Sequence, residues 1–184
     1  MSIFAMTLLA IAPGSVSSLR FTERFTGEVL VNQSAELQGS VPITFSDCGG
    51  ADFLGKVKAM APNALQTGKT TQIVASGSLA KRVKGGTYTI QVKQTLFPYT
   101  TLGLLKDAPI CEERELPLSA VGVKVGKLTW EGLSCPLSAG NIVAKIDMEL
   151  SGKLPTALAS TKTSVTAKGP RGEKLLCVTI ESKR

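Results

Sequence analysis

Short segments in which apolar and polar residues alternate one by one recur along this chain. The clearest are residues 87–93, 142–150 and 175–181. A period of two places successive side chains on opposite faces of an extended strand, so Tyr88, Ile90 and Val92 are expected to face one way. Further strands are expected at 57–60 and 70–81, and Gly-, Pro- and Asn-containing turns separate the segments. With almost no helical period, the pattern predicts an all-β chain folded as a two-sheet β-sandwich.

Two parts of the chain lack this alternation. Residues 18–44 have weak periodicity and are expected to form a flexible or loosely packed extension. Residues 96–133 are expected to be a long insertion between strands. A connection of that length is usually functional or carries local strands of its own. Residues 121–130 do alternate, so they are expected to form such a strand and to cover something apolar.

The N-terminus resembles a secretory signal peptide. Residues 3–12 form an uncharged apolar run, which is too short to span a bilayer but suits the central region of a signal peptide. Pro13 and Gly14 end the run, and we expect cleavage near Ser17, although Ala12 is an alternative site. No Lys or Arg precedes the run, so a buried strand or helix is the competing interpretation. Asn32 begins an Asn-Gln-Ser sequon, which predicts a glycosylation site in a secreted chain.

Four cysteines allow three disulfide pairings. Their positions favour Cys48 with Cys177 and Cys111 with Cys135. The first bond would close a loop of about 130 residues, which on the chain-entropy model stabilises the fold by roughly 5 kcal/mol. Such bonds persist in oxidising compartments, so a secreted or a lysosomal or vacuolar location is expected. A zinc site is the alternative for four cysteines, but the chain has neither a CxxC spacing nor any His.

The lack of His also restricts catalysis. Ser-His-Asp and Cys-His mechanisms are excluded, as is a His-ligated metal centre. The phosphate-binding and nucleophile-elbow glycine motifs are missing too. The acidic cluster at 112–115 lies beside Cys111 and is expected to be a solvated loop face. The sequence therefore predicts a protein that is not an enzyme and that needs no cofactor and no metal.

The net charge of +7 indicates possible partners. Lys81, Arg82 and Lys84 lie in the turn before the strand of Tyr88, and they are predicted to contact anionic membranes. Basic residues that only keep the protein soluble are the alternative. A nucleic-acid partner is disfavoured by the signal peptide and by the lack of interleaved aromatic and basic residues. The chain is expected to act as a monomer, with a membrane transporter or receptor as a possible protein partner.

Three motifs carry a family resemblance. Residues 45–49 (Phe-Ser-Asp-Cys-Gly), residues 134–137 (Ser-Cys-Pro-Leu) with the strand that follows, and residues 172–180 resemble the ML lipid-recognition domain. That family includes the secreted Niemann-Pick sterol carrier and the ganglioside activator protein. The resemblance covers Phe45 to Arg184, which would follow a signal peptide at 1–17 and the extension at 18–44. It implies an immunoglobulin-like sandwich with an apolar cavity between its sheets.

The resemblance also implies a lipid site. The expected lipid-binding residues are Tyr88, Ile90, Val92, Phe97, Tyr99, Ile142, Ile146 and Met148. The inward aliphatic residues could equally fill a closed core, whereas Phe97-Pro98-Tyr99 suits an apolar entrance or a simple loop plug. The expected function is a secreted or endolysosomal carrier of one sterol or phospholipid. The alternatives are a module that presents lipid to a partner protein and, third, an enzyme acting on glycolipids.

Overall fold

The computed structural model describes residues 36–37, 39–96 and 99–183. The chain divides into two units, residues 1–32 and 33–184, and every described strand belongs to the second. The expectations for the signal peptide, for Asn32 and for Phe97 concern residues outside the described ones, and they stay predictions. In the described ranges, no helix has the length and hydropathy that crossing a membrane requires.

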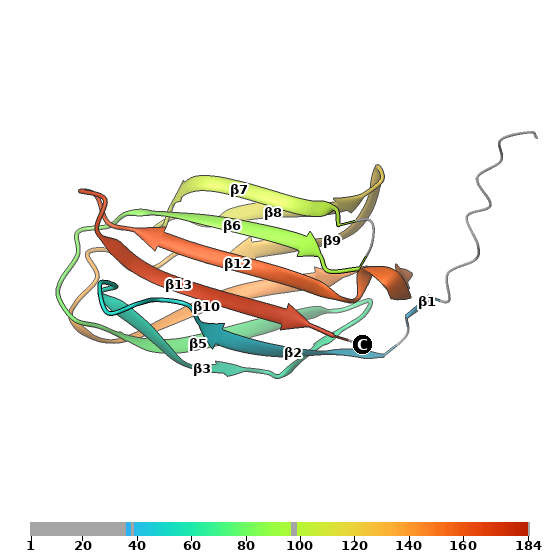
Figure 1. Cartoon of the computed structure of the whole chain (residues 1–184), viewed down its shortest axis with the longest axis horizontal. Helices are drawn as coiled ribbons and strands as arrows, with labels where there is room; N and C mark the ends of the chain where they lie inside the picture. The colour runs from blue at the N-terminus through green and yellow to red at the C-terminus, as the bar shows by residue number, and fades with distance from the viewer. Residues whose placement is uncertain (1–35, 38, 97–98, 184) are drawn as a thin grey trace, which may run out of the picture. The chain divides into compact units, whose positions relative to one another are not determined.

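The second unit is a sandwich of two antiparallel sheets (Figure 1). The five-stranded sheet has the order β3 (Gly55–Ala61), β5 (Thr70–Leu79), β10 (Gly140–Leu150), β9 (Val123–Trp130) and β8 (Arg114–Ala120). The six-stranded sheet has the order β4 (Ala64–Gln66), β2 (Ser40–Asp47), β13 (Lys174–Ser182), β12 (Thr161–Lys168), β6 (Thr87–Gln94) and β7 (Thr101–Pro109). A short pair, β1 (Glu36–Leu37) with β11 (Leu154–Pro155), and the 3-10 turn η1 (Thr156–Leu158) complete the described elements. The predicted fold class is confirmed.

Alternation decides which face of each strand is buried. In β6 the even-numbered residues 88–94 are buried and the odd-numbered ones are more exposed. In β10 Ile146 and Met148 are buried, whereas Val143 on the other face is exposed. The inward faces of both sheets meet in one apolar core, because each sheet has a single face that must leave water.

The prediction that residues 96–133 are an insertion between strands is wrong, whereas the strand expected within them at 121–130 is confirmed as β9. This segment forms three strands, β7, β8 and β9, which extend both sheets. β7 escaped prediction because the register between β6 and β7 shifts twice, and each shift breaks the period of two. β8 contains Pro117, which an edge strand tolerates. The acidic cluster is likewise only partly a loop, since Glu115 lies in β8 and pairs with Lys127 of β9 at 2.6 Å.

The start of the sandwich also differs from the expected boundary. β2 begins at Ser40, five residues before Phe45, and it pairs with β13 and β4. Val41 and Ile43 alternate with exposed neighbours and are buried in the core. Pro42, which lies between them, hid this short alternation in the sequence.

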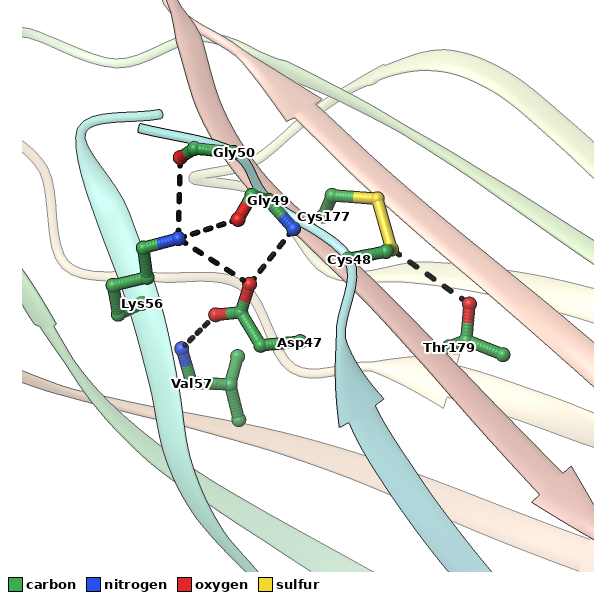
Figure 2. Close-up of a disulfide and its surroundings, with 8 residues drawn as sticks. All are labelled: Asp47, Cys48, Gly49, Gly50, Lys56, Val57, Cys177 and Thr179. Carbon is green, nitrogen blue, oxygen red and sulfur yellow. Dashed lines mark hydrogen bonds and ion pairs between the residues drawn. A yellow bond between two sulfur atoms is a disulfide. The ribbon is translucent and has the colours of Figure 1, made fainter. Parts of the chain in front are cut away.

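The Cys48–Cys177 disulfide joins the end of β2 to β13, with Cα atoms 5.0 Å apart (Figure 2). Asp47, the residue before Cys48, fixes the loop that follows. Its carboxylate accepts hydrogen bonds from the backbone N–H of Gly49 at 2.7 Å and of Val57 at 2.9 Å. The disulfide and the carboxylate therefore hold the ends of β2, β3 and β13 together.

The second disulfide, Cys111–Cys135, lies against the turn that precedes β6. A Cβ atom added to Gly85 would be 3.3 Å from the Cys111 Sγ. Val83 of the same turn exchanges two backbone hydrogen bonds with Leu137, at 3.0 and 2.8 Å. Both cysteine pairs are those that the positions in the sequence favour.

The strands define two ends of the sandwich. At the disulfide end lie both disulfides and the turn at 80–86 (Figure 1). At the hairpin end lie the end of β6, the start of β7 and the β8–β9 turn at Val121–Gly122. β7 and β8 are in contact, since a Cβ atom on Gly103 would lie 2.7 Å from a methyl group of Leu118.

Candidate functional site

Two cavities lie in the space between the sheets. Cavity 1 has a volume of about 50 Å³ and is lined by residues toward the hairpin end. Cavity 2 has a volume of about 100 Å³ and is lined by residues toward the disulfide end. Each volume is below the roughly 300–1,000 Å³ of typical ligand pockets. The sandwich as described is therefore nearly closed, and a large ligand needs the sheets or side chains to move.

Cavity 1 is lined by apolar side chains of both sheets. They include Val92 and Leu102 of the six-stranded sheet and Leu118, Val125, Leu128 and Met148 of the five-stranded sheet. Thr161, Thr163 and Ser182 add a polar margin. The Ser182 hydroxyl donates to the Ala159 carbonyl at 2.6 Å and accepts from the Thr161 N–H at 3.0 Å.

Cavity 2 is lined by Val57, Ile110, Leu137 and Leu175, with two aromatic side chains. The rings of Tyr88 and Trp130 are 5.1 Å apart and tilted by 41°. Burial raises the pKa of Tyr88 to about 12, and the positive charge of Arg114 acts in the opposite direction. The phenol is therefore neutral at physiological pH.

Three branched side chains separate the two cavities. Ile146 of β10, Val165 of β12 and Ile180 of β13 line both of them. Since Ile146 comes from one sheet and the other two from the opposite sheet, they meet across the core. Rotation of these side chains, or a small separation of the sheets, would join the cavities into one apolar channel. We name these three residues the partition.

The structure gathers most predicted lipid-binding residues around these cavities. Val92 and Met148 line cavity 1, Tyr88 and Ile142 line cavity 2, and Ile146 lines both. Ile90 is fully buried but lines neither cavity, so it packs in the core. Tyr99 lies away from the cavities with 77% of its surface exposed, just before β7.

The predicted membrane-contact residues lie at the other end from Tyr99. Lys81, Arg82 and Lys84 are exposed in the turn before β6, whereas Tyr99 follows β6. The eight residues of β6 span about 26 Å at 3.3 Å per residue. The basic turn and the aromatic loop therefore cannot form one contact surface. The sequence already indicated that the two segments are far apart, because they flank the same predicted strand.

Sequence reasoning missed the apolar tip of the β8–β9 hairpin. Val121 is 93% exposed and Val123 is 64% exposed. Val121 also has a φ of 48°, which is a rare conformation for a β-branched residue. Leu96 at the same end is exposed as well. Exposed apolar side chains gathered beside a cavity are typical of a contact surface rather than of a solvated loop.

Three lysines lie at the same end. Lys124 lines a surface groove together with Glu149 and three glycines, and Lys69 and Lys153 directly follow two of them, Gly68 and Gly152, in the chain. Within the described part of the chain, none of the three ammonium groups is in an ion pair. Lys124 shares the groove with the Glu149 carboxylate, and Lys69 and Lys153 follow residues that line it, so lysines outnumber carboxylates around this groove.

The described residues contain no group of three or more His, Cys, Asp or Glu side chains that could hold a metal ion. Both cysteine pairs are oxidised, and no cysteine of the described residues is free. The linings of the two cavities are mostly apolar, which suits binding of an apolar ligand.

Comparisons with known proteins place the chain in a family. Residues 42–183 match the family model of the ML domain. The chain is 26% identical over 167 residues to a phosphatidylglycerol/phosphatidylinositol transfer protein of Emericella nidulans, covering 89% of this chain and 88% of that protein. A protein of the same name from Aspergillus oryzae is 26% identical over 183 residues, with 97% and 92% covered.

Among solved structures, the crystal structure of a Niemann-Pick type C2 protein from the Japanese carpenter ant is similar, with a TM-score of 0.47 and 18% identity. The match covers 75% of this chain and 96% of that chain. The family assignment rests on the family model, which spans most of the chain, from the third residue of β2 to beyond the end of β13. The chain belongs to the ML domain family.

Proposed function

We propose that this protein binds one lipid molecule between its sheets and transfers it between membranes. The observation that carries the proposal is the pair of apolar cavities, enclosed by side chains of both sheets and separated only by the partition. The names of the two fungal relatives support a phospholipid of the phosphatidylglycerol or phosphatidylinositol type as cargo. A sterol is the alternative cargo.

Binding requires the cavities to join. An acyl chain that enters cavity 1 pushes Ile146, Val165 and Ile180 aside and continues into cavity 2. The chain then exchanges the bilayer interior for an apolar wall, so no covalent step is needed. The two disulfides support a secreted protein or one of the lysosomal or vacuolar lumen, because such bonds persist in oxidising compartments.

The lipid is proposed to enter at the hairpin end. Leu96, Val121 and Val123 are exposed there, and an apolar tip that enters the headgroup region gains hydrophobic free energy. The lysines around this end are attracted to an anionic surface by about 1 kcal/mol each when they lie near it. Apolar insertion and electrostatic attraction therefore act on the same end.

Replacing both exposed valines, Val121→Ser with Val123→Ser, is expected to slow lipid transfer by about tenfold. Full burial of a valine side chain contributes about 1.5–3 kcal/mol. Both valines are expected to insert only partly, so replacing the two should cost a comparable amount of binding free energy in total. The measurement is the transfer rate of pyrene-labelled phosphatidylglycerol between phosphatidylglycerol-containing vesicles. Equilibrium binding of the lipid should stay nearly constant, because neither valine lines a cavity.

The triple charge reversal of Lys81, Arg82 and Lys84 to Glu is the matched control at the disulfide end. It should leave the transfer rate nearly unchanged at physiological salt, because β6 separates the turn from the hairpin end by about three Debye lengths of about 8 Å. If the reversal slows transfer and the valine pair does not, the membrane contact lies at the basic turn instead.

A further inference from the structure

The phenol of Tyr88 is a buried polar group without a partner. The side chain is 3% exposed, and its hydroxyl is the one fully buried side-chain oxygen or nitrogen that lacks a hydrogen-bond partner among the described residues. Tyr88 lines cavity 2, where the other side chains are mostly hydrocarbon. A buried hydroxyl without a partner costs folding free energy, so native proteins rarely keep one unless something else binds it.

Other buried polar groups of the sandwich do have partners. The indole N–H of Trp130, whose ring packs against Tyr88, donates to the Ile110 carbonyl at 3.0 Å. The Gln94 amide donates to the Ala157 carbonyl at 3.2 Å. The sandwich can therefore satisfy buried polar atoms, and it does not satisfy the Tyr88 hydroxyl.

We propose that Tyr88 donates a hydrogen bond to an oxygen atom of the bound lipid. Cavity 2 would then select lipids that carry a hydroxyl or a carbonyl oxygen on the buried chain or ring system at that depth over lipids whose buried part is plain hydrocarbon. This inference rests on the proposed function, since it requires a lipid between the sheets. A phenol both donates and accepts, so either kind of oxygen fits the site.

The register of the strands sets the depth of this oxygen. Tyr88 pairs with Ala167 on β12, and Val92, which lines cavity 1, pairs with Thr163. Four residues of strand separate the two positions, which is about 13 Å. A lipid that extends from cavity 1 past the partition therefore meets the hydroxyl about 13 Å further along the core.

A buried water molecule is the competing partner. Cavity 2, at about 100 Å³, has room for one. However, a stable buried water needs two to four polar partners. Ile110, Leu133 and Leu137 beside Tyr88 offer none, and the Trp130 N–H is already bonded. The other polar side chains of the lining are Lys56, Ser76 and Ser78, and Lys56 already donates to the Gly49 and Gly50 carbonyls. A lipid oxygen needs only the one partner that Tyr88 supplies.

The test compares matched lipid pairs on delipidated wild-type protein and on Tyr88→Phe. Two pairs differ in an oxygen deep in the buried part: 12-hydroxystearate with stearate, and 25-hydroxycholesterol with cholesterol. The third pair, diacyl with dialkyl-ether phosphatidylglycerol, differs only at the headgroup end of the chains and should show no preference. Dissociation constants are measured by titration calorimetry. Wild type is expected to prefer the oxygenated member of at least one of the first two pairs by about 2- to 10-fold, the range that one net hydrogen bond gives.

Tyr88→Phe should bind both members of that pair equally. It should also melt at a higher temperature than wild type when both are empty, because the unpartnered hydroxyl is gone. Tyr99→Phe, which removes the other phenol of the chain, should keep the preference.

Equal binding within both of the first two pairs by wild type would overturn the inference while leaving the proposed function intact. If Tyr88→Phe keeps the wild-type preference for the oxygenated lipid, the inference is also overturned and the proposed function stays intact. Failure of wild type to bind any of the six lipids would overturn both.

Discussion

Removing the Cys48–Cys177 disulfide by changing both residues to Ser is expected to lower the free energy of unfolding by about 2–5 kcal/mol. The bond closes a loop with a sequence separation of 129 residues. On the chain-entropy model it restricts the unfolded chain by about 5 kcal/mol, near the upper end of the range. In the folded state it joins β2 to β13 beside the Asp47 carboxylate, so the folded ends should stay together without it (Figure 2).

The matched control is the same change at Cys111 and Cys135. This bond closes a loop with a sequence separation of 24, for which the same model gives about 3.5 kcal/mol. Urea unfolding measures both losses, and the slope of the free energy with urea shows whether the unfolded chain expands. A larger loss at Cys111–Cys135, or a loss below about 1 kcal/mol at Cys48–Cys177, would contradict the chain-entropy explanation.

The second large effect is expected at the partition. Ile146→Phe should reduce lipid binding at least tenfold, because Ile146 lines both cavities and a larger ring blocks the path between them. In a fully closed core the change would overpack and cost about 1–3 kcal/mol. Here the cavities take up part of the ring, so the melting temperature should fall by only a few degrees, at about 2–4 °C per kcal/mol.

Val143→Phe is the matched control on the same strand. Val143 lies on the outward face of β10 and is 55% exposed, so the same ring should change neither binding nor melting. Binding is measured by displacement of a fluorescent phosphatidylglycerol, and melting by circular dichroism. The contradicting result has two parts: the melting temperature of Ile146→Phe falls as far as overpacking of a closed core predicts, and wild type binds no fluorescent phosphatidylglycerol. The space between the sheets would then be only a core.

The sequence predicts the sandwich wherever one strand face meets the core and the other meets water. β6 and β10 satisfy this condition, and their alternation identified Val92, Ile146 and Met148 as inward residues that line the cavities. β7 does not, because shifts in its pairing with β6 break the period of two. Leu102 on β7 was missed for that reason, and Leu118 on β8 was missed because Pro117 argues against a strand there. With them much of the wall of cavity 1 was missed.

Other features of the site depend on contacts between distant residues. The alternation of β6 places Tyr88 in the core, but the sequence does not show that its hydroxyl lacks a partner there. The same limit applies to the partition, which forms only where β10 faces β12 and β13. By contrast, the separation of Lys81 from Tyr99 followed from strand direction alone, and the sequence analysis overlooked it.

The central claim is that a lipid chain lies between the sheets, and Trp130 reports on it directly. It is the single tryptophan of the chain, it is buried, and it lines cavity 2. The measurement is Trp130 fluorescence after loading with phosphatidylglycerol whose acyl chains carry bromine, compared with the same lipid without bromine. A bound chain that passes the partition brings bromine into contact with the indole, so strong quenching by the brominated lipid alone is expected. Undiminished fluorescence with brominated lipid bound to the protein would show that the lipid lies outside the sandwich.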